Sequence, residues 1–486
     1  MRDILKAGSK VAFATLVGLL GSVVTGKVLS LELGAAGLGL YGMLRQLLQN
    51  LTLIGSFNGQ NALVQGIAHH SDNRLQVRFS GSVLSIQIII SGALAMILLI
   101  GAPWLGPLLI PHSQSVGLLR WLSLAMLVLV ANAYVLGLLN GHRLINQLVK
   151  FQLLGPIATL VLLYPSIMLI RAGQTFGYLL MLVGASLLIT LVAARAVYRS
   201  GYFPSLSDLS ISKADGVQFL RMSSVLTMAG IIATAVQFSQ SWLVARWMGL
   251  AQTGQFWAAW TLSMTYVSLV LGSLGTYYLP SLSRLVDPAE RRELIRKYFL
   301  LVLLFMPLLV SLVVVFKPIF IELMFSSTML PALKVMRWML IGDFFKAVSY
   351  VLSYPMLAFN DMKWFFWTDI IFSLGIGVAS FVWVFFGGDI EGLGMIFMIV
   401  YILFLVVSVI YIRIKHAVVF NIEEFGRFFL GLALVLILSL YTWKSEHVSW
   451  GDVSTLVLLC GVFVIISIRG INWYSMQSLW KRNTEL

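Results

Sequence analysis

The chain has 486 residues, of which 59% are hydrophobic and only 11% are charged, and its formal net charge is +14. This composition excludes a soluble globular protein and predicts a single membrane domain, because no segment between the apolar runs is long enough to bury a core of its own. The basic residues flank the apolar runs, which favours contact with anionic lipid headgroups over binding of nucleic acid.

The apolar runs predict the fold class. A helix needs about 20 apolar residues to cross the hydrocarbon core of a bilayer, and the sequence predicts an all-α polytopic membrane protein with about fourteen such helices. The first run is too long for a signal peptide and lacks a cleavage pattern, so we interpret it as a membrane span. The predicted spans are residues 10–31, 40–66, 81–103, 115–141, 148–170, 176–198, 217–245, 254–280, 298–317, 335–358, 364–386, 392–413, 426–443 and 452–469.

Lysine and arginine residues are concentrated in the loops on one side of the predicted spans, with the densest group at residues 284–297. The loops on the other side hold only scattered bases such as Arg171, Lys317 and Lys444. Basic loops remain in the cytoplasm, so we expect both termini there. This alternation requires an even number of spans, which favours fourteen.

Short sequence matches indicate an internal repeat. Gly34 and Gly39 recur as Gly249 and Gly254 at an offset of 215 residues, and the pair that begins at Arg120 recurs farther along. Two copies with an even number of spans would face the same way and could rock against each other around a central cleft. The predicted organisation is an N-terminal six-helix lobe at residues 1–200, a cytoplasmic linker at 201–216, a C-terminal six-helix lobe at 217–415, and two additional helices with a cytoplasmic tail at 416–486.

Several kinds of chemistry are excluded or not expected. Cys460 is the only cysteine, so neither an intrachain disulfide nor a thiolate metal site can form. The histidines have no metal-ligand spacing, and the sequence contains no phosphate-binding Walker loop and no nucleophile elbow. We therefore expect no cofactor, no metal and no catalytic residues.

Polar side chains inside the spans are the first candidate functional residues. Arg45, Gln49, Thr52 and Ser56 follow one face of the second span. Small and hydroxyl residues in such a stripe are equally consistent with close helix packing. A cation as deep as Arg45 is not explained by packing, because a charge inside a span costs about 2.5–3.5 kcal/mol even on the mild insertion scale. We expect Arg45 to face a watery cleft and to bind an anionic substrate.

Asp343 and Lys346 lie one turn apart in the tenth span. They could simply neutralise each other. Alternatively, Lys346 could bind an anionic group while Asp343 acts as a protonatable carboxylate for ion coupling.

Four further cations stand toward the outer ends of their spans, where each could reach the headgroups by itself or contribute to an outer phosphate site. They are Lys27, Arg120, Arg246 and Arg337. A second set of polar and aromatic residues could line the cleft for a glycan, with ordinary helix packing as the alternative. This set is Gln49, Asn58, Asn61, Gln237, Trp257, Trp260 and Tyr266.

Specific strings are spread over about residues 1–415. They are Gly26-Lys27, Gly34 to Leu40, Arg45-Gln46-Leu47, Phe57-Asn58-Gly59, Gly141 to Arg143, Tyr277 to Leu285, and Gly342-Asp343 with Lys346. These strings resemble the Wzx-type O-antigen and enterobacterial common antigen translocases, which belong to the multidrug/oligosaccharidyl-lipid/polysaccharide exporter superfamily. The last 70 residues depart from the resemblance by adding two spans, as lipid II flippases of that superfamily do, and Arg337 stands where those translocases have a small residue.

The resemblance implies a flippase of the bacterial inner membrane rather than an enzyme. Its substrate would be undecaprenyl pyrophosphate carrying an oligosaccharide, moved from the cytoplasmic to the periplasmic leaflet by alternating access. Membrane lipids, a polysaccharide polymerase and a chain-length regulator would be its partners. The two extra helices would either widen a groove for the lipid tail or serve packing alone.

Three other functions remain open at the level of sequence. A cation-coupled drug exporter of the same superfamily should have an acidic cleft, whereas the cleft predicted here is chiefly basic. A polymerase or ligase acting on the same lipid should have a sizeable periplasmic loop with catalytic groups, and the predicted outer loops are short. A structural scaffold would leave the charges inside the spans unexplained.

Overall fold

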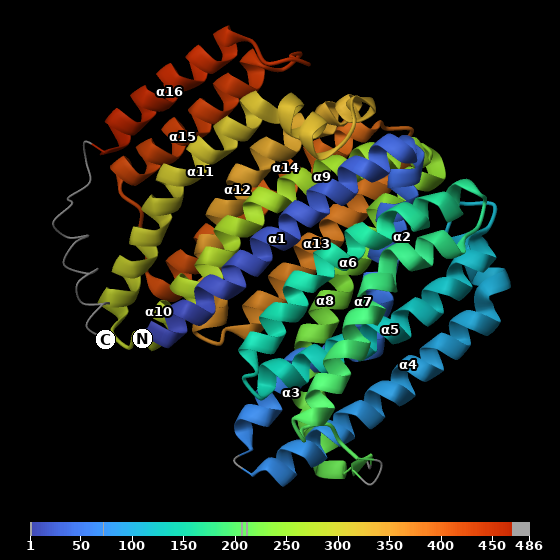
Figure 1. The fold of residues 1–486 in the computed structure, drawn as a ribbon. Coiled ribbons are helices and arrows are strands. Elements are labelled where there is room, and N and C mark those ends of the chain that lie inside the picture. The colour runs from blue at the N-terminus through green and yellow to red at the C-terminus, as the bar shows by residue number, and fades with distance from the viewer. Residues whose placement is uncertain (1, 71, 206–207, 210–211, 469–486) are drawn as a thin grey trace. The chain divides into compact units, whose positions relative to one another are not determined.

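The computed structural model describes residues 2–70, 72–205, 208–209 and 212–468. Over these ranges the chain is helical and forms no strand, which confirms the predicted all-α membrane fold (Figure 1). The elements are α1 (Arg2–Glu32), α2 (Gly34–Ser56), α3 (Gly59–His69), α4 (Asn73–Leu109), α5 (Ser115–Gly141), α6 (Ile145–Arg171), α7 (Phe176–Arg199), α8 (Lys213–Trp247), α9 (Leu250–Ser273), η2 (Leu274–Tyr278), α10 (Leu279–Arg284), α11 (Pro288–Met324), η3 (Ser327–Ala332), α12 (Leu333–Ala358), α13 (Met362–Phe385), α14 (Ile390–His416), α15 (Ile422–Tyr441) and α16 (Trp450–Ile468).

Each predicted span overlaps at least one of these helices, and the span at 254–280 overlaps α9, η2 and α10. Among the described residues, 11 helices are long and apolar enough to cross a membrane. Helix α12 is not among them, since Asp343 and Lys346 lower its mean hydropathy. Helix α12 is nevertheless deeply buried, with residues such as Leu340, Phe344 and Val348 in contact with protein on all sides.

The second predicted span is not one continuous helix. It breaks between α2 and α3, where Phe57 and Asn58 adopt left-handed backbone conformations with φ of 49° and 53°. Asparagine tolerates this conformation better than most residues. The side-chain amide of Gln87 on α4 donates to the carbonyl of Ser56, at 2.8 Å, so a backbone group released by the break is satisfied inside the protein.

The described chain forms two compact units. Unit 1 comprises residues 1–257 and 323–329, and unit 2 comprises residues 258–322 and 330–486. Helix α8, predicted to begin the second lobe, belongs to unit 1, where Asn50 of α2 donates to the carbonyl of Thr234 at 3.0 Å. The two compact units therefore have other boundaries than the two lobes predicted from the repeat. The boundaries of the lobes stay a prediction.

One pair of helices lies at the same 215-residue offset as the sequence matches. Helices α4 and α11 each have 37 residues, and their ends lie 215 residues apart (288 against 73, and 324 against 109). Gly34 is the first residue of α2, and Gly249 is the residue before α9. Both have positive φ, at 66° and 97°. Within unit 1 the backbones of Gly39 and Gly254 approach so closely that a Cβ on Gly254 would lie 2.1 Å from the carbonyl oxygen of Ala35.

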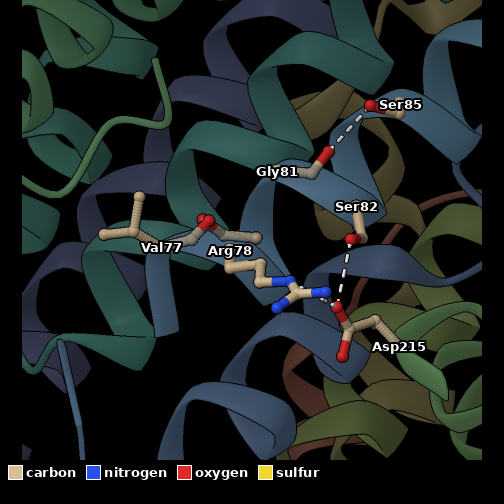
Figure 2. Close-up of polar contacts among 7 residues, drawn as sticks. Val77, Arg78, Gly81, Ser82, Ser85 and Asp215 are labelled. Atoms are coloured by element: carbon tan, nitrogen blue, oxygen red, sulfur yellow. Dashed lines mark hydrogen bonds and ion pairs between the residues drawn. The ribbon is translucent and has the colours of Figure 1, made fainter. Parts of the chain in front are cut away.

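Within unit 1, the segment between α7 and α8 packs against α5, and the start of α8 contacts α4. Tyr202 stacks on His142 with ring centroids 3.9 Å apart, and Phe203 meets Tyr134 edge-on. At the start of α8, Asp215 accepts a hydrogen bond from Ser82 at 3.2 Å and lies 3.9 Å from the guanidinium of Arg78 (Figure 2). These contacts fix the ends of the segment to α4 and α5.

Gly81, beside Ser82 on α4, allows this segment to lie close to the helix. A Cβ at Gly81 would meet the carbonyl oxygen of Asp208 at 2.3 Å, whereas a Cβ at Gly92 on the same helix would meet nothing within 4 Å. We expect Gly81→Ala to raise the rate of trypsin cleavage after Arg199 or Lys213 about tenfold, since a penalty near 1.4 kcal/mol changes the population of the detached segment by that factor. Gly92→Ala is the matched control, and equal cleavage rates for the two variants would contradict the account.

In unit 2 the two additional helices form a hairpin beside α11 (Figure 1). Gly431 of α15 lies against Pro307 of α11, and Phe428 packs on Phe344 of α12. Lys317 is only 1% exposed and donates to the carbonyl of Thr442 at 2.9 Å. The hairpin is therefore attached to the helices of unit 2 by apolar packing and by a buried ammonium group.

Candidate functional site

The candidate site lies inside unit 2, where α9 and α14 pack on α12. Helix α12 carries its two charges, Asp343 and Lys346, in its most buried stretch, at 0% and 5% exposure. A buried charge is costly unless polar or aromatic groups surround it. Residues on α9 and α14 provide these groups.

The Asp343 carboxylate is satisfied entirely by hydroxyl groups of α9. Ser263 Oγ lies 2.8 Å from both carboxylate oxygens, and Tyr266 Oη donates to Oδ2 at 2.5 Å. Ser263 and Tyr266 are three residues apart and so share one face of α9. Tyr266, predicted to line a glycan cleft, is 7% exposed and serves this carboxylate in the structure.

The Lys346 ammonium is enclosed by soft and aromatic groups instead. Its Nζ lies 3.2 Å from the sulfur of Met264, and 5.0 Å, 5.5 Å and 6.0 Å from the ring centroids of Tyr401, Phe397 and Trp260. Aromatic faces attract a cation through their negative quadrupole, with an energy of about 2 kcal/mol in a desolvated setting. We call these four residues the Lys346 cage.

Lys346 makes no ion pair with any residue in the described part of the chain. Residues three apart on a helix are near enough to pair, yet the Asp343 carboxylate is engaged by α9. The result is a buried cation whose contacts hold its position without neutralising its charge. Such a group is suited to binding an anion.

A cavity of about 200 Å³ lies one helical turn beyond Lys346, between α12, α13 and α14. That volume is enough for several water molecules. The lining includes hydroxyl groups and the carboxylate of Asp369, a residue that the sequence analysis did not single out. The lining residues are Tyr350, Ser353, Tyr354, Met356, Leu357, Phe365, Thr368, Asp369 and Phe404.

Two of the remaining predicted residues are engaged in unit 1. Lys27 donates to the carbonyl of Phe325 at 2.7 Å, which joins α1 to the segment at residues 323–329. Trp257 is 9% exposed and packs edge-on against Tyr41 and Phe325. For Trp257, the packing alternative describes its observed environment.

Arg45 and Gln49 are exposed on α2, while their neighbours Gln46 and Asn50 are buried. Asn50, which lies outside the predicted polar stripe, joins α2 to α8 by donating to the carbonyl of Thr234, whereas Arg45 and Gln49 of the stripe are exposed. Gln237 on α8 is half-buried. The role of Arg45 in binding an anion stays a prediction.

Asn58 and Asn61 lie at the break in the second span. The side chain of Asn61 donates to that of Asn58 at 2.9 Å, and Asn58 is the residue before α3. This pairing stabilises the turn between the two helices. Their predicted contact with a glycan stays a prediction.

The outer cations lie in different surroundings. Arg120 and Arg246 are exposed. The guanidinium of Arg337 lies 5.2 Å from the ring centroid of Trp443, in the hairpin formed by α15 and α16. Arg337 lies nine residues before Lys346 on α12, about 13 Å along the helix axis. Its aromatic contact is Trp443 and not a residue of the Lys346 cage.

Sequence reasoning found Asp343, Lys346, Trp260 and Tyr266 but missed the residues that complete their environment. Those are Ser263 and Met264 on α9 and Phe397 and Tyr401 on α14. One signal was present: Phe397 and Tyr401 are four residues apart, as are Trp260 and Met264, which places each pair on one helix face.

The family model described as "Polysaccharide biosynthesis protein" matches residues 7–286, which is more than half of the chain. The chain belongs to the polysaccharide biosynthesis protein family. The family-level resemblance inferred from sequence strings is thereby confirmed.

Individual relatives agree with this family. The chain is similar to the Lipid III flippases of Escherichia coli (strain K12) and Shigella flexneri, with 25% identity over 374 residues, 75% of this chain and 88% of each relative. Its fold is similar to that of the lipid II flippase MurJ in an inward closed conformation, with a TM-score of 0.71 and 16% identity over 99% of this chain and 100% of that one.

The fold is also similar to that of an inward-facing multidrug resistance transporter of the MATE family, which belongs to the MOP superfamily. The TM-score is 0.68 and the identity 15%, over 83% of this chain and 94% of that one. Together with the family match, these similarities confirm the prediction of a multi-pass membrane transporter rather than an enzyme. The polysaccharide biosynthesis family member described here thus has the fold of the MOP superfamily.

Proposed function

We propose that the protein is a flippase for lipid-linked oligosaccharides in the bacterial inner membrane. Its substrate is undecaprenyl pyrophosphate carrying an O-antigen unit or a related polysaccharide repeat unit, which moves from the cytoplasmic to the periplasmic leaflet. Both termini lie in the cytoplasm. Membership of the polysaccharide biosynthesis family and the similarity to Lipid III flippases over 88% of their length support this proposal.

The observation that carries the proposal is the Lys346 ammonium, buried in the Lys346 cage and without an ion-pair partner among the described residues. A buried positive charge repels a cationic substrate and attracts an anionic one. A pyrophosphate group offers the charge-assisted oxygen acceptors that an ammonium binds most strongly. Arg45, and with it Lys27, Arg120, Arg246 and Arg337, would provide further positive charge along the path of the headgroup.

The glycan would follow the headgroup through the same path. We propose that it contacts amide and aromatic side chains, because flat rings and amides suit the apolar faces and hydroxyl groups of sugars. The lipid tail would stay in the bilayer, and the two repeats would alternate between access to the two leaflets. The contacting residues would be Gln49, Asn58, Asn61, Gln237, Trp257, Trp260 and Tyr266.

The membrane potential provides a driving force without ATP. Moving one elementary charge through 100 mV is worth about 2.3 kcal/mol. An anionic headgroup that leaves the negative interior is helped by about this amount per charge. Asp343 would be the first candidate for a coupled proton or cation.

A polysaccharide polymerase and a chain-length regulator would act on the product and so are proposed as partners.

The test is a leaflet-accessibility assay with purified protein in liposomes that contain undecaprenyl pyrophosphate bearing a defined oligosaccharide. A membrane-impermeant glycosidase reports which leaflet the headgroup occupies. We expect translocation that accelerates when the compartment the headgroup leaves is made negative. The same oligosaccharide on uncharged undecaprenol is the matched control, and it should move far more slowly.

Other outcomes would favour the competing functions. Export of a lipophilic cation, without movement of the lipid-linked sugar, would support a drug exporter. Glycan products longer than the added oligosaccharide would support a polymerase or ligase. Wild-type translocation by Arg45→Ala and Lys346→Ala variants would remove the proposed anion site, even if the protein is a flippase.

A further inference from the structure

Helix α9 presents different chemical groups to the two charges of α12. Ser263 and Tyr266 bind the Asp343 carboxylate with hydroxyl groups. Trp260 and Met264, on the adjacent face of α9, contact the Lys346 ammonium without offering it an oxygen. One helix therefore keeps a carboxylate and an ammonium apart although their positions on α12 would allow them to pair.

This separation is not the arrangement expected from the two charges alone. An aspartate and a lysine three residues apart in a low-dielectric interior attract each other strongly. Rotation of the Asp343 side chain toward Lys346 would neutralise both. The three short hydroxyl contacts to the carboxylate, at 2.8, 2.8 and 2.5 Å, provide the opposing force.

We infer that Ser263 and Tyr266 are positioning residues, which hold the Asp343 carboxylate away from Lys346 so that the ammonium keeps its charge available for an anionic headgroup. The inference rests on the proposed function and deepens it. The Lys346 cage holds the ammonium in place without neutralising it. Aromatic rings and a thioether attract a cation but do not accept its protons as a carboxylate would.

The consequence is a rescue that ordinary structural damage would not show. Tyr266→Phe removes the donor to Oδ2 and frees Asp343 to pair with Lys346, so the translocation rate should fall about tenfold, as expected for losing one charge-assisted contact. Adding Asp343→Asn removes the competing charge. The double variant should return to near the wild-type rate when no ion gradient is applied. Ser263→Ala, alone and combined with Asp343→Asn, should give the same pattern.

A second measurement separates this inference from the proposed function. Binding of inorganic pyrophosphate to the purified full-length protein, followed by calorimetry, needs no lipid substrate. Weakened binding by Tyr266→Phe and recovered binding by Tyr266→Phe/Asp343→Asn would support the inference even if every lipid-linked oligosaccharide fails to move. Translocation by the wild type combined with no rescue in either double variant would overturn the inference and leave the flippase function standing. Wild-type binding and translocation by both Tyr266→Phe and Ser263→Ala would also overturn it.

Discussion

Replacing Lys346 with methionine is expected to reduce translocation of a pyrophosphate-linked oligosaccharide by about 10- to 100-fold, the loss expected for a hydrogen bond to a charged group worth 1.5–3 kcal/mol. Methionine keeps the length of the side chain and fits among Trp260, Phe397 and Met264. The leaflet-accessibility assay measures the rate. Lys346→Arg, which retains the charge, should keep a substantial part of it.

The same substitution should leave the fold intact. Lys346 has no ion-pair partner among the described residues, and methionine removes the cost of burying its charge, so the apparent Tm of Lys346→Met should equal or exceed that of the wild type. Lys334→Met, an exposed lysine on the same helix, is the matched control and should translocate normally. Wild-type translocation by Lys346→Met would refute the role given to this residue.

The second large effect is expected at the glycine contact in unit 1. Gly254→Ala would place a Cβ 2.1 Å from the carbonyl oxygen of Ala35, and Gly39→Ala would place one 2.2 Å from that of Leu250. Both obstacles are backbone atoms, so the helices must separate. We expect each variant to lose about 2–3 kcal/mol of stability and about 5–10 °C of apparent Tm at a fixed scan rate.

Two comparisons make this prediction specific. Gly272→Ala, also on α9, introduces a Cβ that meets nothing within 4 Å. It should leave the Tm unchanged or raise it slightly, because alanine is favoured over glycine in helices. The Gly39→Ala/Gly254→Ala double variant should lose less than the sum of the single losses, since one separation of the helices accommodates both methyl groups. Equal Tm values for Gly254→Ala and Gly272→Ala would contradict the observed helix contact.

The sequence predicts the helices well because long apolar runs have few alternatives in a membrane. It predicts their ends less well. The span that contains Lys317 was predicted to end at that residue, with Lys317 as a loop base. Helix α11 instead continues through Pro318 to Met324, and Lys317 is buried against Thr442. Neighbouring helices satisfy the backbone groups that a proline leaves free, so proline does not end a membrane helix reliably.

The candidate site was predictable only in part for a related reason. Asp343 and Lys346 are conspicuous because a charge in an apolar run is expensive. Their partners are not conspicuous: Phe397 and Tyr401 are ordinary residues of an apolar helix, and Ser263 is one of many hydroxyl residues in α9. Only the packing of α9 and α14 on α12 decides which charge each of them meets. The sequence therefore identified the charged residues and left open whether they pair with each other.

The most direct measurement is a cryo-electron microscopy structure of the protein in lipid nanodiscs with undecaprenyl pyrophosphate bearing an oligosaccharide. The account predicts phosphate density within about 4 Å of Lys346 Nζ, the range of a charge-assisted contact, with Asp343 still bound by Ser263 and Tyr266. Headgroup density bound elsewhere, with Lys346 paired to Asp343 or still enclosed by its four cage residues, would contradict the account.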